Sequence, residues 1–110
     1  MEIEKNELEE IVYQKLKKLP EFFQKKLENV EFFVEDGHST RFLGLYHGVP
    51  FGKRTNYNLV MPDKIIIYRR AFERACKNKK ELEKKVEEVL LHEIGHYFGF
   101  NEQQLRNLGY

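Results

Sequence analysis

The chain has 110 residues, which is enough for one compact domain with a single hydrophobic core. Hydrophobic residues make up 41% and charged residues 34%, a balance typical of a folded protein and not of a disordered one. The net charge of +1 gives no electrostatic reason to expect binding to nucleic acid or to an anionic membrane.

We expect no membrane span and no signal peptide from the sequence. There is no run of about 18 apolar residues, and the first four residues include two glutamates and no basic residue, whereas a signal peptide begins with basic residues. The single cysteine, Cys76, cannot form an internal disulfide, which fits a reducing compartment. We therefore expect one domain over residues 1–110, located in the cytoplasm.

Two helices are expected first. Asn6 can cap a helix, and Glu9, three residues later, completes a capping-box pattern. Pro20 ends this helix and suits the first turn of a second, shorter one that runs to about Asn29. The apolar side chains at helical spacing are Leu8, Ile11, Val12, Leu16 and Leu19 in the first helix, and Phe22, Phe23 and Leu27 in the second. We expect both helices to pack on a sheet.

Three segments have the pattern of β-strands. Residues 30–35 alternate between apolar and polar side chains. Residues 42–46 are almost continuously apolar, and Gly44 within them marks a point of close approach or a bulge. Residues 64–68 contain three consecutive isoleucines, which favour a strand. We expect an antiparallel or mixed sheet of three or four strands.

A short helix is expected around residues 71–76, followed by a long helix that begins after Asn78, with Glu81 as its capping-box partner. The apolar stripe of the long helix consists of Leu82, Val86, Val89 and Leu90. Its extension falls on Glu93 and His96, where the pattern predicts core. Buried polar groups need partners, and a metal ion would supply them. A hydrogen-bonded His–Glu pair without metal is the alternative.

These ionisable groups form an H-E-x-x-H motif, with His92, Glu93 and His96 at the fixed positions. Positions four apart on an α-helix lie about 40° apart on one face, so the two imidazoles can converge on one ion. Glu93 lies beside that face, where its carboxylate could take a proton from a metal-bound water. The plain alternative is two surface histidines on an amphipathic helix.

A third ligand is expected from the residues that follow. Gly99 can end the helix in a left-handed turn, which could return Glu102 to the metal. Alternatively, Glu102 is only a first-turn carboxylate of a closing helix, capped by Asn101 with Gln104 as box partner.

Other polar residues are weaker candidates. His38 and His47 are expected to be surface or packed histidines with no metal contact. Arg41, Arg54 and Tyr57 lie on loops that could face a cleft, and Tyr57 could stabilise an oxyanion there.

The spacing His92-Glu93-x-x-His96-x-x-Gly99-x-x-Glu102 resembles the extended metzincin motif, with Glu where metzincins have His or Asp. From about residue 8 to residue 109 the chain is similar to the minimal zincins, which are small bacterial and archaeal zincin-like domains. Residues 43–50 and 62–69 support this similarity. The resemblance implies an α+β, zincin-like fold, in which a small three- or four-stranded mixed sheet packs with N-terminal helices and a long active-site helix.

The resemblance also implies a metal-dependent peptidase activity. We expect one Zn²⁺ per chain, held by His92, His96 and Glu102, with one position left for water. Glu93 would act as general base and then as proton donor to the leaving amine. A peptide or protein substrate in extended conformation would pair with an edge strand, for which residues 42–47 are the candidate.

Two other functions stay open. The domain could be a non-catalytic zincin-like binding module in which the metal only fastens the fold. It could also be a metal-dependent nuclease resembling the bacterial ribosomal-RNA-maturation endonucleases, which share H-x-x-x-H. Those proteins have Gly after the first histidine, where this chain has Glu93. We expect no nucleic-acid partner and no membrane partner.

Overall fold

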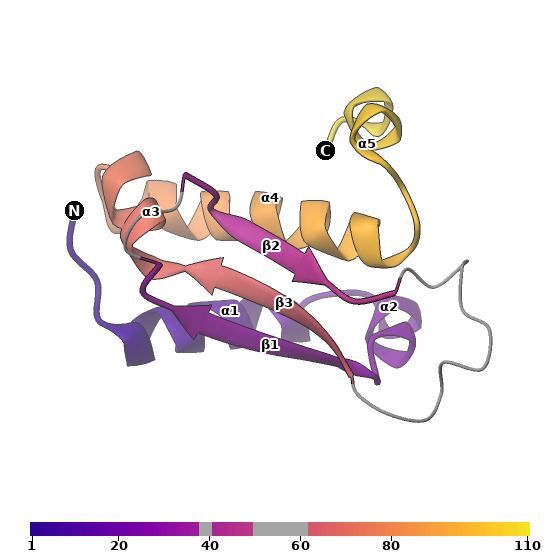
Figure 1. The fold of residues 1–110 in the computed structure, drawn as a ribbon. Coiled ribbons are helices and arrows are strands. Elements are labelled where there is room, and N and C mark those ends of the chain that lie inside the picture. The colour runs from indigo at the N-terminus through magenta and orange to yellow at the C-terminus, as the bar shows by residue number, and fades with distance from the viewer. Residues whose placement is uncertain (38–40, 50–61) are drawn as a thin grey trace.

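A computed structural model describes residues 1–37, 41–49 and 62–110 of the chain. Its elements in chain order are α1 (Lys5–Lys17), α2 (Glu21–Lys26), β1 (Val30–Glu35), β2 (Gly44–His47), β3 (Asp63–Tyr68), α3 (Arg69–Ala75), α4 (Lys79–Tyr97) and α5 (Glu102–Leu108). Figure 1 shows two layers, with the sheet in front and α1 and α4 behind it. Helix α1 contacts α4 and β1, and α4 contacts β2.

The described part of the chain forms a three-stranded mixed sheet in the order β1-β3-β2. Strand β1 is parallel to β3, with Val30 opposite Asp63, and β2 is antiparallel to β3, with Gly44 opposite Ile67. The α+β class and the mixed sheet predicted from the sequence are confirmed. Strand β2 is an edge of this sheet, as expected for residues 42–47.

The core lies between the sheet and the two long helices. Ile65 and Ile67 of β3 are completely buried, because β3 is the central strand and its inner face lies against the helices. The helices bury the apolar stripes that the sequence predicted, namely Leu8, Ile11 and Val12 from α1 and Leu82, Val86 and Leu90 from α4. The helical periodicity was therefore a correct guide to the core at both helices.

The start of α1 differs from the prediction. Asn6 lies inside the helix, and the N-cap is Glu4, which makes no side-chain capping bond. The tertiary anchoring of Ile3 determines this start instead. Ile3 is buried, its N–H donates to Glu73 at 2.9 Å, and its carbonyl oxygen accepts from Arg69 at 3.0 Å. The predicted Asn6 cap is thus wrong, because contacts with α3 fix the backbone just before the helix.

The second helix and the second strand also differ in detail. Helix α2 ends at Lys26 and contains no buried residue, so its predicted packing on the sheet is wrong. Phe22 is 65% exposed, and Leu27, just beyond the helix, is the residue of this segment that enters the core. Strand β2 begins at Gly44, and Phe42 is exposed.

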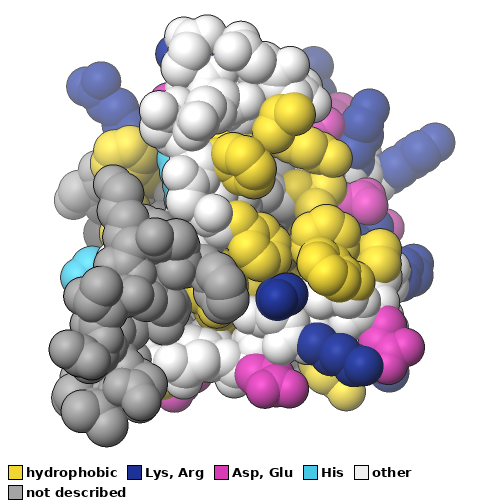
Figure 2. All heavy atoms as spheres, turned by 90° about the vertical axis from the view of Figure 1, so that its right-hand side faces the viewer, with side chains coloured by type: hydrophobic (Ala, Val, Ile, Leu, Met, Phe, Trp, Pro, Cys, Tyr) yellow, Lys and Arg dark blue, Asp and Glu magenta, His cyan; other side chains and the backbone are white. Residues whose placement is uncertain are grey.

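The aromatic residues of α2 contribute to an apolar surface. Figure 2 shows apolar side chains gathered on the face where α2, the end of α4 and α5 meet. They surround a shallow cavity of about 140 Å³. Its lining residues are Leu19, Phe23, Leu91, Ile94, Gly95, Phe98, Phe100, Leu105, Leu108 and Tyr110. Short helices around one end of α4 leave this surface only partly covered.

The N-termini of α4 and α5 follow local sequence signals. The Asn78 side chain accepts from the Glu81 N–H, as predicted. In a complete capping box the Glu81 carboxylate would accept from the Asn78 N–H. Here it accepts from the N–H of the preceding residue, Lys77. Asn101 and Gln104 form a complete capping box at α5.

None of the helices in the described residues is both long and apolar enough to cross a bilayer.

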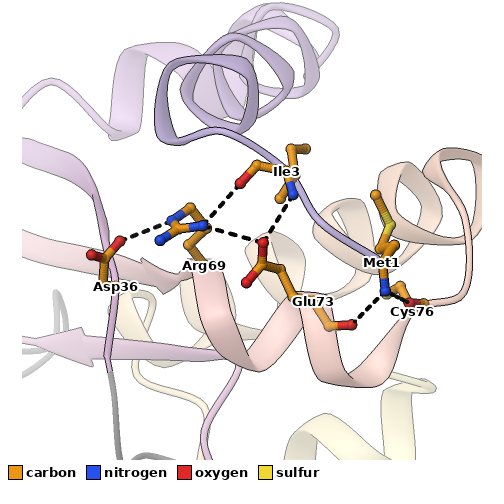
Figure 3. A network of polar contacts seen from close by, with 6 residues as sticks. All are labelled: Met1, Ile3, Asp36, Arg69, Glu73 and Cys76. Carbon is orange, nitrogen blue, oxygen red and sulfur yellow. Dashed lines mark hydrogen bonds and ion pairs between the residues drawn. The ribbon is translucent and has the colours of Figure 1, made fainter.

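An ion-pair network joins the N-terminal segment, the end of β1 and α3 (Figure 3). Arg69 Nε donates to Asp36 Oδ1 at 2.8 Å, while its Nη1 donates to the Ile3 carbonyl oxygen and to Glu73 Oε2 at 3.2 Å. The guanidinium is largely buried, since the side chain is only 18% exposed. One cation therefore holds three segments that are distant in sequence.

Replacing this cation should destabilise the fold. We expect Arg69→Gln to lower the free energy of unfolding by roughly 1.5–3 kcal/mol, the typical contribution of hydrogen bonds to charged groups. For a domain of about 100 residues this corresponds to a decrease of roughly 4–8 °C in Tm per kcal/mol. Thermal melts followed by circular dichroism measure it. The matched control is Arg70→Gln, because Arg70 is exposed and only its backbone N–H bonds to Asp36. Equal melting of both variants and wild type would contradict the role of the network.

Candidate metal centre

The residues of the H-E-x-x-H motif lie on the last turns of α4, and Glu102 is the first residue of α5. A sharp turn connects the two helices. Gly99 has a φ of 97°, a left-handed conformation that favours glycine, and its N–H bonds to the His96 carbonyl oxygen at 2.9 Å. The turn reverses the chain within a few residues, so the start of α5 returns to the end of α4.

Three side chains converge there. Glu102 Oε1 lies 2.7 Å from His96 Nε2, and both carboxylate oxygens lie 3.2 Å from His92 Nε2. The three ligand atoms lie within 4.8 Å of one another. The imidazole rings are 4.9 Å apart and nearly perpendicular, at 82°. Three electron-donating atoms from two helices therefore face one point.

This donor set fits zinc. Catalytic zinc sites have three protein ligands, drawn from imidazole nitrogen and carboxylate oxygen among others, and keep a fourth position open. With bonds of about 2.0–2.2 Å in a tetrahedron, ligand atoms lie roughly 3.3–3.5 Å apart. The carboxylate oxygens lie 2.7 Å from His96 Nε2 and 3.2 Å from His92 Nε2, and all three ligand atoms lie within 4.8 Å of one another, which is close to this range. The three residues could therefore hold one ion without rearrangement of the helices.

A backbone contact orients one of the imidazoles. His96 Nδ1 lies 2.9 Å from the Phe100 carbonyl oxygen. A carbonyl oxygen only accepts hydrogen bonds, so Nδ1 carries a proton, which leaves Nε2 as the nitrogen that could bind a metal. Such outer contacts of a metal-binding histidine fix the tautomer and the ring orientation. The other nitrogen of this ring, Nε2, faces Glu102, where the other ligand atoms converge.

Glu93 lies beside this centre and is 8% exposed. Its carboxylate accepts a hydrogen bond from the backbone N–H of Tyr46 in β2. Burial raises the pKa of Glu93 above that of an ordinary glutamate, although the Tyr46 bond and the charges of His92 and His96 act in the opposite direction. The carboxylate is thus fixed near the three ligand atoms but is not one of them.

Glu102 is in a different environment. It is 63% exposed, and its slight burial acts to raise its pKa, but the hydrogen bonds and positive charge of His92 and His96 outweigh this effect. The pKa of Glu102 is therefore lowered. The two alternatives drawn from the sequence are both compatible with this geometry: Glu102 opens a helix capped by Asn101, and its side chain also reaches both imidazoles.

His92, His96 and Glu102 line a cleft of about 770 Å³. Residues 41–46 line one side of it, and residues 99–102 line the other. Gly44 allows this arrangement, since a Cβ at that position would lie 2.7 Å from Val89 Cγ1 and 3.4 Å from Glu93 Cγ. The close approach predicted at Gly44 is therefore present, and it brings the edge strand β2 directly onto α4.

A comparison with known families agrees with this geometry. The family model described as zincin-like metallopeptidase matches residues 27–110. The chain belongs to this family. No curated protein matches the sequence. The match confirms the resemblance to small zincin-like domains and the zincin-like fold, and it covers β1 to α5, including the cleft and the proposed ligands.

The other candidate residues lie in several places. Arg41 lines the cleft of the zincin-like domain. His47 lies at the exposed end of β2 and is not among the described residues whose ligand atoms converge. The predictions for His38, Arg54 and Tyr57 fall outside the described residues.

Two features of the centre were not predicted from the sequence. Tyr46 and Phe100 contact Glu93 and His96 through backbone atoms. Backbone donors and acceptors occur at almost every residue, so no sequence signal could have identified these two. The sequence also predicted full burial of the end of α4. Glu93 is buried, but His92 and His96 are only half-buried, because the cleft opens above them.

The raised pKa of Glu93 predicts a pH-dependent stability of the metal-free protein. A carboxyl group whose pKa is higher in the folded state stabilises the fold below its unfolded pKa, and this stability is lost as pH rises through the folded pKa. Glutamine does not titrate, so Glu93→Gln should gain stability relative to wild type as pH rises above the ordinary glutamate pKa of about 4.3.

Thermal melts between pH 4 and pH 8 with a chelator present would measure this difference. Glu88→Gln is the matched control, since Glu88 is an exposed carboxylate on the same helix. Its difference from wild type should stay nearly constant with pH. The stability difference between Glu93→Gln and wild type should be larger at pH 8 than at pH 4. An equal difference at both pH values would contradict the burial effect.

Proposed function

We propose that this chain is a zinc-dependent peptidase that holds one Zn²⁺ with His92, His96 and Glu102. The observation that carries this proposal is the convergence of the three ligand atoms within 4.8 Å, beside a buried carboxylate and in an open cleft. Membership of the zincin-like metallopeptidase family supports both the metal and the class of substrate.

Zinc, when bound, supplies Lewis-acid chemistry: it lowers the pKa of water from 15.7 to about 7 and polarises a peptide carbonyl. The chain supplies the proton transfers. Glu93 accepts a proton from the attacking water and then donates it to the leaving nitrogen. Its burial raises its pKa, which suits a group that must both take and release a proton near neutral pH. The Tyr46 N–H holds the carboxylate in position.

The substrate would be a peptide or protein segment in extended conformation that adds to the edge of β2. The ladder geometry indicates which groups are available. The Leu43 carbonyl oxygen accepts from the Tyr68 N–H at 2.9 Å, so Leu43 faces β3. Backbone groups alternate along an antiparallel strand, and those of Gly44 and Tyr46 therefore point away from β3, toward the open edge. Since the Tyr46 N–H bonds to Glu93, Gly44 is the main pairing position for a substrate.

We place this activity in the cytoplasm, because the only cysteine, Cys76, is a free buried thiol and the chain has no internal disulfide. The near-neutral net charge of +1 gives no support to the nuclease alternative.

A non-catalytic role has one observation in its favour. The ligands come from two helices, and α5 contains a single buried residue, Leu105. A metal ion would therefore fasten α5 to α4 whether or not the site is catalytic. Substitutions of Glu102 and Glu93 would separate a third ligand from a helix-capping carboxylate, and an enzyme from a metal-fastened scaffold.

The first concerns Glu102. If its carboxylate binds the metal, Glu102→Ala should weaken zinc affinity by more than the roughly 10–100-fold that is typical for loss of an outer-shell partner. Competition titration with a chelating dye measures this affinity. Glu81→Ala is the control, because Glu81 is also a first-turn carboxylate but lies at the other end of α4. Unchanged affinity in Glu102→Ala, with a loss of only about 0.3–1 kcal/mol in stability, would assign Glu102 to the helix dipole alone.

The second concerns Glu93. Glutamine can keep part of the hydrogen bonding but cannot transfer a proton. Zinc-loaded Glu93→Gln should therefore fold and bind metal yet lose roughly 10²–10⁴-fold in the rate of peptide hydrolysis. Cleavage of a mixed peptide library, followed by mass spectrometry, measures the rates. If wild type cleaves no peptide, or if the variant is equally fast, the scaffold role replaces the enzymatic one.

A further inference from the structure

The cleft has a polar floor but apolar walls. Three of its lining residues are large apolar side chains that remain exposed, namely Phe42 at 66%, Leu45 at 39% and Phe100 at 40%. Phe42 and Leu45 belong to the β2 side, and Phe100 belongs to the turn between α4 and α5. The proposed ligands lie between the two sides. A substrate at the metal centre would therefore pass between apolar surfaces.

The Phe100 side of the cleft is fixed relative to the proposed ligands. The Phe100 N–H donates to the Gly95 carbonyl oxygen at 3.1 Å, and the Phe100 carbonyl oxygen accepts from His96 Nδ1 at 2.9 Å. Both backbone groups of Phe100 are thus engaged with the last turns of α4. The ring projects from a backbone that is held by one of the imidazoles, so its distance from the centre varies little.

The Phe42 side is anchored by the sheet. Phe42 is followed by Leu43, whose carbonyl oxygen bonds to β3, and by Gly44, which packs on Val89 of α4. The backbone after Phe42 is therefore held both in the sheet and against the active-site helix. A residue at this position lies at the mouth of the cleft, next to the open edge of β2.

The exposed aromatic rings at these positions are removed from water only when an apolar group of a bound molecule covers them. Removal of apolar surface from water is the main favourable term in such contacts, and aromatic rings contribute the largest areas. The carboxylates that line the cleft, Glu93 and Glu102, are engaged by Tyr46 and by the imidazoles. Arg41 also lines the cleft and is a cation, so the walls favour apolar over basic side chains in a bound peptide.

We propose that the cleft selects peptides whose scissile bond is flanked by aromatic or long aliphatic side chains, with Phe42 and Phe100 as the residues that determine this specificity. This inference rests on the proposed peptidase function. It adds the class of side chain that the site accepts, which neither the zinc-binding motif nor the family match contains.

Two peptide pools of equal length and net charge would test it. The central positions carry Phe, Tyr, Leu and Ile in one pool, and Ala, Ser, Gly and Asn in the other. Binding to zinc-loaded Glu93→Gln is measured by fluorescence anisotropy, and cleavage by zinc-loaded wild type is mapped by mass spectrometry. We expect a preference for the apolar pool of roughly 10–200-fold, the range for differences in apolar contacts at enzyme sites.

Variants then assign the preference to the walls. Phe42→Ala and Phe100→Ala should each reduce it severalfold while zinc affinity stays unchanged, because the backbone contacts of Phe100 remain. The matched controls are Phe22→Ala for Phe42 and Phe33→Ala for Phe100, since these side chains are 65% and 37% exposed and lie outside the cleft. Controls that reduce the preference as strongly as the wall variants would overturn the assignment.

The two levels of the proposal fail in different ways. Equal binding and equal cleavage of both pools would overturn the inference and leave the peptidase function supported. Preferential binding of the apolar pool by Glu93→Gln, without cleavage by wild type, would support the inference about the cleft and count against the peptidase function.

Discussion

The close packing of β2 on α4 is the constraint on which the candidate site depends. It is possible because Gly44 has no side chain where Val89 and Glu93 lie. This contact brings the Tyr46 N–H to the Glu93 carboxylate, and β2 is an edge of the three-stranded sheet that the described residues form. A larger residue at this position would separate strand from helix, and the buried carboxylate would lose its donor while the cleft changed width.

The second determinant is the reversal of the chain after α4. Gly99 adopts a left-handed conformation, Phe100 bonds back to the last turn, and the Asn101 capping box starts α5. Each of these is a local event, yet together they return the Glu102 carboxylate to two imidazoles that lie one turn apart on the preceding helix. Helix capping and convergence of the ligand atoms are therefore compatible consequences of one turn.

The sequence predicted those features that are encoded locally. The H-E-x-x-H spacing, the left-handed Gly99, the Asn101 capping box and the strand at residues 30–35 all follow from residue type and period. The failures arose where a distant contact overrides a local preference. Ile3, held by α3, displaced the predicted cap at Asn6, and exposure of Phe22 contradicted an apolar pattern that indicated burial. The backbone contacts of Tyr46 and Phe100 have no counterpart in residue type at all.

Helix α5 is attached to the rest of the domain at the place where the proposed metal would act. Helix α5 is held by Leu105, which packs in the space above Gly95, and by Glu102 on the two imidazoles. Without an ion, the Glu102 carboxylate and the two imidazoles stay in contact by sharing protons in hydrogen bonds. An ion would replace those protons and keep the same three groups together at neutral pH. In the proposed function, metal binding would thus both complete the site and fix the helix that carries the third ligand.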